Sequence, residues 1–443
     1  MPVSPARVAA FHILLRVEQE DAYAAELLHS TRYTRLDSAD HGLATELVMG
    51  VLRWRSWLDQ EIARQSSLPL TKLDPEVLTS LRLAVYQIMF LDRIPSRAAI
   101  HESVELVKQA RKRSAVSFTN AVLRKLAGPK GSAISAIAAS RTSPQLAAQS
   151  AHPEWLVERW IREFGFDPAV KICSYDQQIP ETEIRIRNPA DEEELKKEQI
   201  QLAPGRILSS ARRVIAGNLT GTSAFREGRI AIQDEASQLV AQLLGQGSRI
   251  LDCCAAPGGK TRALAEQNPL ATVLAAEIHP HRARLLRKLV SATNVQVVAA
   301  DACALPLTEL FDRVLVDVPC SGTGTLARNP EIKWRLKAED LVDLRTRQLS
   351  ILCSAMQRVA APGRLVYATC SLEREENQTV VESALSSDSS FKLLNCREHL
   401  EQLLSRGELV WEDLSSLTSG PYFRTIPGVH PCDGFFAAIL EKL

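Results

Sequence analysis

The sequence has no pair of cysteines in a CxxC arrangement, no long apolar run and almost no net charge. Its nine cysteines are an odd and scattered set, which argues against a disulfide framework and against a structural zinc site. No apolar run reaches the ~18 residues that a membrane-spanning helix needs, and the N-terminal segment lacks a secretory signal pattern. We therefore expect a cytoplasmic protein with reduced thiols, no metal centre and no membrane contact.

The formal net charge is only +1, so the charge of the whole chain does not indicate a nucleic-acid partner. Its distribution is more informative, because no Asp or Glu lies between Leu106 and Pro153. The basic residues of this stretch are Lys108, Arg111, Lys112, Arg113, Arg124, Lys125, Lys130 and Arg141. Such a stretch is typical of a surface that contacts phosphates, and equally of a solvated helix face.

Residues 1–128 are predicted to form an all-helical domain. Apolar side chains recur there at spacings of three and four, which places each set on one face of a helix. The two clearest sets are Leu47, Val51, Trp54, Leu58 and Ile62, and Leu78, Leu81, Val85 and Ile88. Asp74 and Pro75 are typical of a helix start, as N-cap and first residue. Helices with such stripes must pack on one another, which predicts a bundle.

Two shorter regions follow. Residues 129–150 are rich in Ala, Ser, Gly and Pro, and this composition predicts a linker. Residues 151–229 are predicted to be a small α+β module. A helix is expected at 154–164, and the alternation of Ile184 and Ile186 indicates a strand.

Residues 230–443 alternate between short apolar runs and helix-like stretches. The runs are SRILDCC, ATVLAAE, VQVVAAD, DRVLVDV and GRLVYAT. Near-continuous apolar strands that alternate with helices predict an α/β fold with a doubly wound parallel sheet. Ligands of such sheets bind outside the carboxyl ends of the strands, so those ends are where functional residues are expected.

The first strand ends at Asp252, and a turn with two glycines, Gly258 and Gly259, follows it. Adjacent glycines allow the backbone to approach a ligand closely before the next helix starts. The residues Gly259-Lys260-Thr261 match part of a phosphate-binding P-loop. That motif also requires glycine where this sequence has Cys254, so the P-loop interpretation fails.

Acidic residues end the next two strands. Glu277 suits the hydroxyls of a ribose, and Asp301 suits an adenine amino group or the closure of the pocket. Together with the glycine turn, they predict a nucleoside-type cofactor. Helix N-capping is the alternative role for both acids.

The fourth and fifth strand ends carry Asp317, Cys320 and Cys370. A thiolate that adds to carbon 6 of cytosine makes carbon 5 nucleophilic, so that it can attack an electrophilic methyl group. A carboxylic acid can stabilise the adduct at ring N3, and a base must remove the carbon 5 proton. One acid and two thiols meet these needs.

The motifs DCCAAPGGKT, DVPCSGTG and YATCS, the last followed by Glu376 and Asn377, resemble those of the RNA cytosine-5 methyltransferases of the Sun/NOL superfamily. The resemblance covers residues 230–443, including QDEAS at 233–237 and the tail from Pro427 to Phe436. Residues 1–128 resemble the NusB-type antitermination domain. Together they imply a Rossmann-like catalytic domain, S-adenosyl-L-methionine as cofactor and 16S ribosomal RNA as substrate. The target cytosine must be unpaired or extruded for the thiol to reach carbon 6, and nothing in the sequence demands more than a monomer.

The resemblance also implies roles for individual residues. Cys370 matches the nucleophile, Cys320 matches the cysteine that releases the product, and Asp317 matches a residue that contacts both cytosine and cofactor. DNA cytosine-5 enzymes use the cysteine of the Pro-Cys motif instead, so resemblance alone selects Cys370. The implied cofactor-binding residues are Cys254, Ala255, Ala256, Pro257, Gly258, Gly259, Lys260, Glu277, Asp301 and Asp317.

Two further basic clusters suggest an RNA surface: Arg282, Arg284, Arg287 and Lys288, and Arg328, Lys333, Arg335 and Lys337. Trp334 lies within the second cluster and either stacks on a base or packs in the protein. Two other functions are compatible with the sequence. One is methylation of cytosine in tRNA, and the other is an RNA-binding or antitermination factor without catalysis.

Overall fold

The computed structural model describes the whole chain except residues 1–2, 21, 31–32, 34–35, 128–136 and 291. The chain forms two compact units. Unit 1 consists of residues 1–179 and 326–335, and unit 2 of residues 180–325 and 336–443. Within the described part, no helix has the length and apolar character that a membrane crossing requires.

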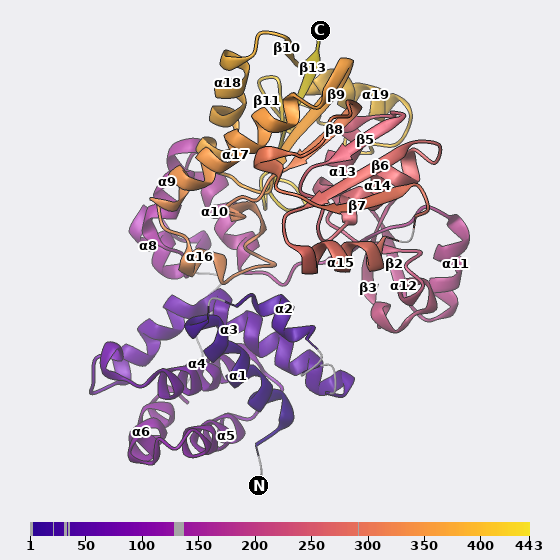
Figure 1. Ribbon diagram of the computed structural model, residues 1–443. Coiled ribbons are helices and arrows are strands. Elements are labelled where there is room, and N and C mark those ends of the chain that lie inside the picture. Colours follow the sequence, from indigo (N-terminus) through magenta and orange to yellow (C-terminus); the bar gives the residue numbers. More distant parts are fainter. Residues whose placement is uncertain (1–2, 21, 31–32, 34–35, 128–136, 291) are drawn as a thin grey trace. The chain divides into compact units, whose positions relative to one another are not determined.

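Among the described residues of unit 1, all regular secondary structure is helical (Figure 1). Its α-helices are α1 (Pro5–Gln19), α2 (Ala24–Leu28), α3 (Ser38–Gln65), α4 (Pro75–Phe90), α5 (Ser96–Gln109), α6 (Val116–Leu126), α8 (Ser143–Gln149), α9 (Glu154–Phe164), α10 (Phe166–Asp176) and α16 (Ile332–Arg335). The predicted stripe on α3 is buried, from Leu47 to Ile62. Helix α4 begins at Pro75 with Asp74 as its N-cap residue, as predicted.

The predicted linker and module do not coincide with the two units. Residues 129–136 of the predicted linker lie outside the described residues, and α8 occupies part of the rest. Helices α9 and α10 belong to unit 1, because the apolar face of α9, with Leu156 and Trp160, packs on α8 and α10. The predicted module at 151–229 is therefore divided between the units.

The remainder of that module is a small antiparallel sheet in unit 2. Its strands are ordered β2-β3-β1-β4: β2 (Gln201–Pro204), β3 (Ala211–Ala216), β1 (Thr182–Arg185) and β4 (Ala231–Ile232). Helices α11 (Pro189–Lys197) and α12 (Ser223–Arg226) accompany it. Ile184 and Ile186 are buried in its core, as their alternation predicted.

The segment 326–335 belongs to unit 1, although its neighbours in sequence belong to unit 2. Lys333 is only 1% exposed, and its amine donates to the carbonyl of Arg53 at 2.8 Å. The indole N–H of Trp334 donates to the Leu52 carbonyl, and Arg335 donates to two carbonyls in and after α1. The prediction that Lys333 faces RNA is therefore wrong, and Trp334 is bound within the protein.

The large sheet of unit 2 has nine strands in the order β11-β12-β13-β9-β8-β5-β6-β7, with β10 beside β13. Five are parallel: β5 (Arg249–Asp252), β6 (Thr272–Glu277), β7 (Val295–Ala299), β8 (Phe311–Asp317) and β9 (Val359–Thr369). Four antiparallel strands extend the β9 edge: β10 (Phe391–Leu394), β11 (Thr418–Ser419), β12 (Tyr422–Arg424) and β13 (Phe436–Lys442). The predicted parallel sheet is confirmed and is part of a larger mixed sheet.

Helices cover both faces of this sheet (Figure 1). One face packs on α13 (Glu235–Leu244), α14 (Gly259–Gln267) and α19 (Cys396–Ser405), and the other on α17 (Asp340–Met356) and α18 (Gln378–Ser387). Leu315 of β8 points to the first face, and its neighbours Val314 and Val316 point to the second. Burial on both faces explains why the strand sequences are continuously apolar.

The strand order reverses between β5 and β8, since the chain first builds outward through β6 and β7 and then returns to the other side of β5. In an open α/β sheet, this switch point leaves a crevice at the carboxyl ends of the strands. The fold thus fixes the position of a ligand site before any side chain is considered.

Burial lowers the pKa of Lys333 from its ordinary value of 10.5 to about 7. Between these two values the unfolded chain carries a proton at this lysine that the folded chain has lost. The contribution of Lys333 to stability must therefore rise with pH across that window.

We expect the melting temperature of the wild type, relative to Lys333→Met, to increase between pH 7 and about pH 9. Lys337→Met, at an exposed lysine nearby, is the control. The same pH trend in both variants would contradict the assignment.

Candidate active site

A cavity of about 310 Å³ lies in unit 2 at the carboxyl ends of the parallel strands. This volume is within the range of small-molecule sites. The predicted residues that line it are Cys254, Ala256, Lys260, Glu277, Asp301, Asp317, Cys320 and Cys370. The other predicted residues, from Ala255 through Gly259 apart from Ala256, form the turn behind this lining. The sheet thus brings together side chains that are up to 116 residues apart between Cys254 and Cys370.

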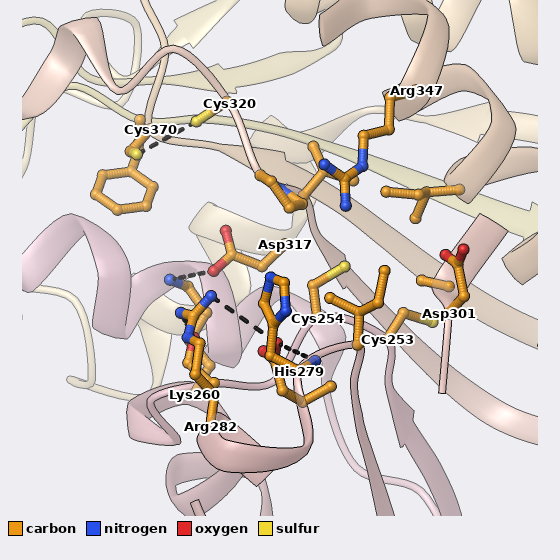
Figure 2. A pocket seen from close by; sticks show the side chains of 18 residues that line it. Cys253, Cys254, Lys260, His279, Arg282, Asp301, Asp317, Cys320, Arg347 and Cys370 are labelled. Atoms are coloured by element: carbon orange, nitrogen blue, oxygen red, sulfur yellow. Dashed lines mark hydrogen bonds and ion pairs between the residues drawn. The ribbon is translucent and has the colours of Figure 1, made fainter. Parts of the chain in front are cut away.

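The two thiols meet at one side of the cavity, with their Sγ atoms 3.3 Å apart (Figure 2). Cys370 directly follows β9, and Cys320 lies three residues after β8. The strands are paired in parallel with Asp317 opposite Ala368, and the N–H of Val318 donates to the Ala368 carbonyl at 3.0 Å. The contact with Cys370, together with burial, raises the pKa of Cys320 well above its ordinary value.

A lysine–carboxylate pair lies between the thiols and the rest of the cavity (Figure 2). Lys260 Nζ is 2.8 Å from Asp317 Oδ2 and 5.0 Å from the centre of the Phe435 ring. Burial opposes the charge of Lys260, but attraction to Asp317 outweighs it and raises the lysine pKa, with a smaller contribution from Cys370. The ammonium group therefore stays charged beside the two thiols.

The glycine turn leads directly into a helix, as the sequence predicted. Gly258 has φ +115°, which residues with a side chain rarely adopt, and a Cβ there would come within 2.5 Å of Leu286 Cδ1. Helix α14 starts at the next residue. At the strand end before the turn, Asp252 accepts from the hydroxyl of Thr261, and burial raises its pKa to about 7.

Both predicted acids on the cofactor side have a capping contact as well as a place in the cavity. Glu277, 4% exposed, accepts the backbone N–H of His279 at 3.0 Å. Asp301 accepts the N–H of Cys303 at 2.9 Å and lies across the cavity from the thiols (Figure 2). The capping interpretation and the cofactor interpretation are thus compatible.

Sequence reasoning missed several lining residues. His279 follows Glu277, Arg347 lies on α17, and Phe435 lies in the tail before β13. Phe435 belongs to the tail from Pro427 to Phe436, whose resemblance to the family already indicated that it is important. Arg347 gave no signal, because an arginine on a helix ordinarily indicates a solvated face.

The basic residues are distributed over two surfaces. Arg282, Arg284, Arg287 and Lys288 are all exposed on α15 (Pro280–Leu289), and Arg282 also lines the cavity. In unit 1, a groove of about 700 Å³ between α5 and α6 is lined by Arg97, Lys108 and Arg124. Lys108 and Lys112 pair with acids outside the acid-free stretch. Whether these surfaces contact phosphates stays a prediction.

Comparison with known proteins matches two parts of the chain to protein families. Residues 241–441 match the model of the 16S rRNA methyltransferase RsmB/F family, and residues 4–128 match the NusB family. A relative from Bacillus subtilis, described as a probable ribosomal RNA small subunit methyltransferase B, is 34% identical over the full length of both chains. The ribosomal RNA small subunit methyltransferase B of Pseudomonas putida is 32% identical and covers 80% of this chain and 82% of its own.

Solved structures show the same fold. A methyltransferase homologue from Pyrococcus horikoshii aligns with 69% of this chain and 100% of its own, at a TM-score of 0.56 and 24% identity. A second structure aligns over the full length of both chains, at a TM-score of 0.80 and 23% identity. With full-length relatives above 30% identity and both family models in place, the chain belongs to the 16S rRNA methyltransferase RsmB/F family.

Proposed function

We propose that this protein methylates carbon 5 of a cytosine in 16S rRNA, and that Cys370 forms a covalent bond to the base. The observation that carries the proposal is the pair of thiols 3.3 Å apart beside a carboxylate and a charged lysine. The relatives named ribosomal RNA small subunit methyltransferase B support the choice of RNA. An unpaired or extruded cytosine is required, because a stacked base does not expose carbon 6 to a thiol.

The cofactor of this family is S-adenosyl-L-methionine, which supplies an electrophilic methyl group when it is bound. The residues of the cavity fit such a molecule. Glu277 is a buried carboxylate suited to ribose hydroxyls, and Asp301 suits the adenine amino group. The turn at Gly258 and the start of α14 present backbone N–H groups suited to the methionine carboxylate.

The first chemical role belongs to Cys370. Its thiolate adds to carbon 6 of the cytosine, and the electron pair of the C5–C6 double bond moves toward ring N3, which makes carbon 5 nucleophilic. The ammonium group of Lys260 interacts electrostatically with Cys370, and so places a positive charge beside the attacking sulfur. A proton held in the Lys260–Asp317 pair stabilises the adduct at N3.

The second role belongs to Cys320. Once carbon 5 carries the methyl group, Cys320 removes the remaining hydrogen from that carbon as a proton. The electrons of the C–H bond restore the C5–C6 double bond, and the bond from carbon 6 to Cys370 breaks. Its contact with Cys370 and its burial raise the pKa of Cys320, so the thiol must first lose its proton to water, and the resulting thiolate is then a strong base. The choice of Cys370 over Cys320 as nucleophile comes from the family motifs.

Replacing each thiol by alanine should separate the two roles. We expect Cys370→Ala to form no covalent complex with RNA, because the attacking sulfur is missing. Cys320→Ala should accumulate that complex, since attachment proceeds and release stalls, and its turnover should fall by about 10²–10⁴-fold. Denaturing gels of enzyme mixed with cofactor and unmodified 16S rRNA measure the complex.

Cys353→Ala is the matched control, because Cys353 is a free thiol on α17 that does not line the cavity. It should behave like the wild type. Accumulation of the complex in Cys370→Ala and its absence in Cys320→Ala would show that Cys320 is the nucleophile. Absence of methyl transfer to any RNA by the wild type, with cofactor bound, would overturn the proposed function.

The assignment of Glu277 leads to a binding prediction. Glu277→Gln should weaken the binding of S-adenosylhomocysteine by about 1.5–3 kcal/mol, because hydrogen bonds to a charged acceptor are lost. Isothermal titration calorimetry measures the affinity, and Glu309→Gln, at an exposed acid, is the control. An unchanged affinity in Glu277→Gln would contradict the assignment.

A further inference from the structure

Glu376 is a buried carboxylate behind the two thiols, and it takes no part in the chemistry described above. It is 0% exposed and is the last residue of a short 3-10 helix, Arg374–Glu376. It is not among the described residues that line the cavity. It therefore acts on the reaction only through other residues.

The carboxylate of Glu376 joins the two cysteine loops. Each catalytic cysteine is followed by a serine, Ser321 in one loop and Ser371 in the other. Glu376 Oε1 accepts the backbone N–H of Ser321 at 2.8 Å and the side-chain amide of Gln348 at 2.8 Å. Glu376 Oε2 accepts the hydroxyl groups of both serines, whose oxygen atoms are 3.0 Å apart. Four donors from three separate segments thus converge on one side chain.

The surroundings hold the carboxylate in place. The hydroxyl of Tyr367 donates to the backbone carbonyl of Glu376 at 2.6 Å. Gln348, on α17, also donates to the carbonyl of Pro319, the residue before Cys320, at 3.0 Å. A buried carboxylate is costly unless donors surround it, and three of the four donors belong to the loops that carry the thiols. Glu376 therefore keeps its full set of hydrogen bonds only while the loops keep their present arrangement.

We propose that Glu376 is a positioning residue, which holds Ser321 and Ser371 together and so fixes the separation of the Cys320 and Cys370 thiols. The inference takes its chemical meaning from the proposed function, because one cytosine must be reached by both sulfur atoms. The hydrogen bonds around Glu376 do not depend on that function. Failure of the positioning role of Glu376 can therefore be distinguished from failure of the methylation proposal.

Glutamine at position 376 is the most informative substitution. Its side chain has the same shape, but only one of its two polar atoms accepts hydrogen bonds. Part of the donor set then loses its acceptor, and the two loops are no longer held together. Displacement of a reacting group by about 1 Å is able to lower the rate about a hundredfold. We expect a loss of that size in kcat for Glu376→Gln, with a KM for RNA that changes far less.

Thiol bridging by dibromobimane gives a readout that needs neither RNA nor cofactor. The reagent becomes fluorescent when both of its arms react with nearby thiols, and Cys320→Ala supplies the background signal. The wild type and Glu382→Gln, an exposed acid on α18, should be bridged rapidly. Glu376→Gln should be bridged several-fold more slowly. Wild-type bridging and wild-type kcat in Glu376→Gln would overturn the proposal.

Should Glu376→Gln fail to fold, the double variant Ser321→Ala and Ser371→Ala decides the question. It leaves the carboxylate in place and removes the two hydroxyl donors, so slower bridging and a lower kcat are expected. Wild-type values for both would overturn the proposal. A wild type that is bridged normally but methylates no RNA would reject the proposed function without contradicting the positioning role of Glu376.

Discussion

Parallel hydrogen bonding between β8 and β9 brings together two loops whose cysteines are fifty residues apart in the sequence. Each strand is buried on both faces, so its register is fixed by the helices on either side. A slip of one residue would turn apolar side chains such as Leu315 and Val316 to the opposite faces. It would also move Asp317 relative to Cys370. The stability of the sheet and the geometry of the site therefore depend on the same pairing.

Charge is the second constraint on the site. Lys260 and Asp317 neutralise each other at the edge of the cavity, and Glu376 is surrounded by donors behind it. The thiols lie between a cation on one side and a carboxylate on the other. This arrangement suits a reaction in which one sulfur must act as a nucleophile and the other as a base.

Much of this site was predictable, because strand ends leave a clear trace in the sequence. An apolar run that stops at Asp252, Glu277 or Asp317 indicates both the strand and the edge where it ends. Segments without such a trace were not predicted. Three of the four antiparallel strands beyond β9, namely β10, β11 and β12, have only two to four residues. Lys333 resembles any surface lysine until its burial is seen. The role of Glu376 depends on contacts among three segments, which no single pattern contains.

The central claim is that the methyl group replaces the hydrogen on carbon 5 of cytosine. Unmodified 16S rRNA that carries tritium at this carbon tests the claim directly. Release of tritium to water is measured alongside the incorporation of carbon-labelled methyl groups from the cofactor. We expect one hydrogen to be released for each methyl group transferred. Methyl transfer without the release of tritium would place the modification on another atom and contradict the account.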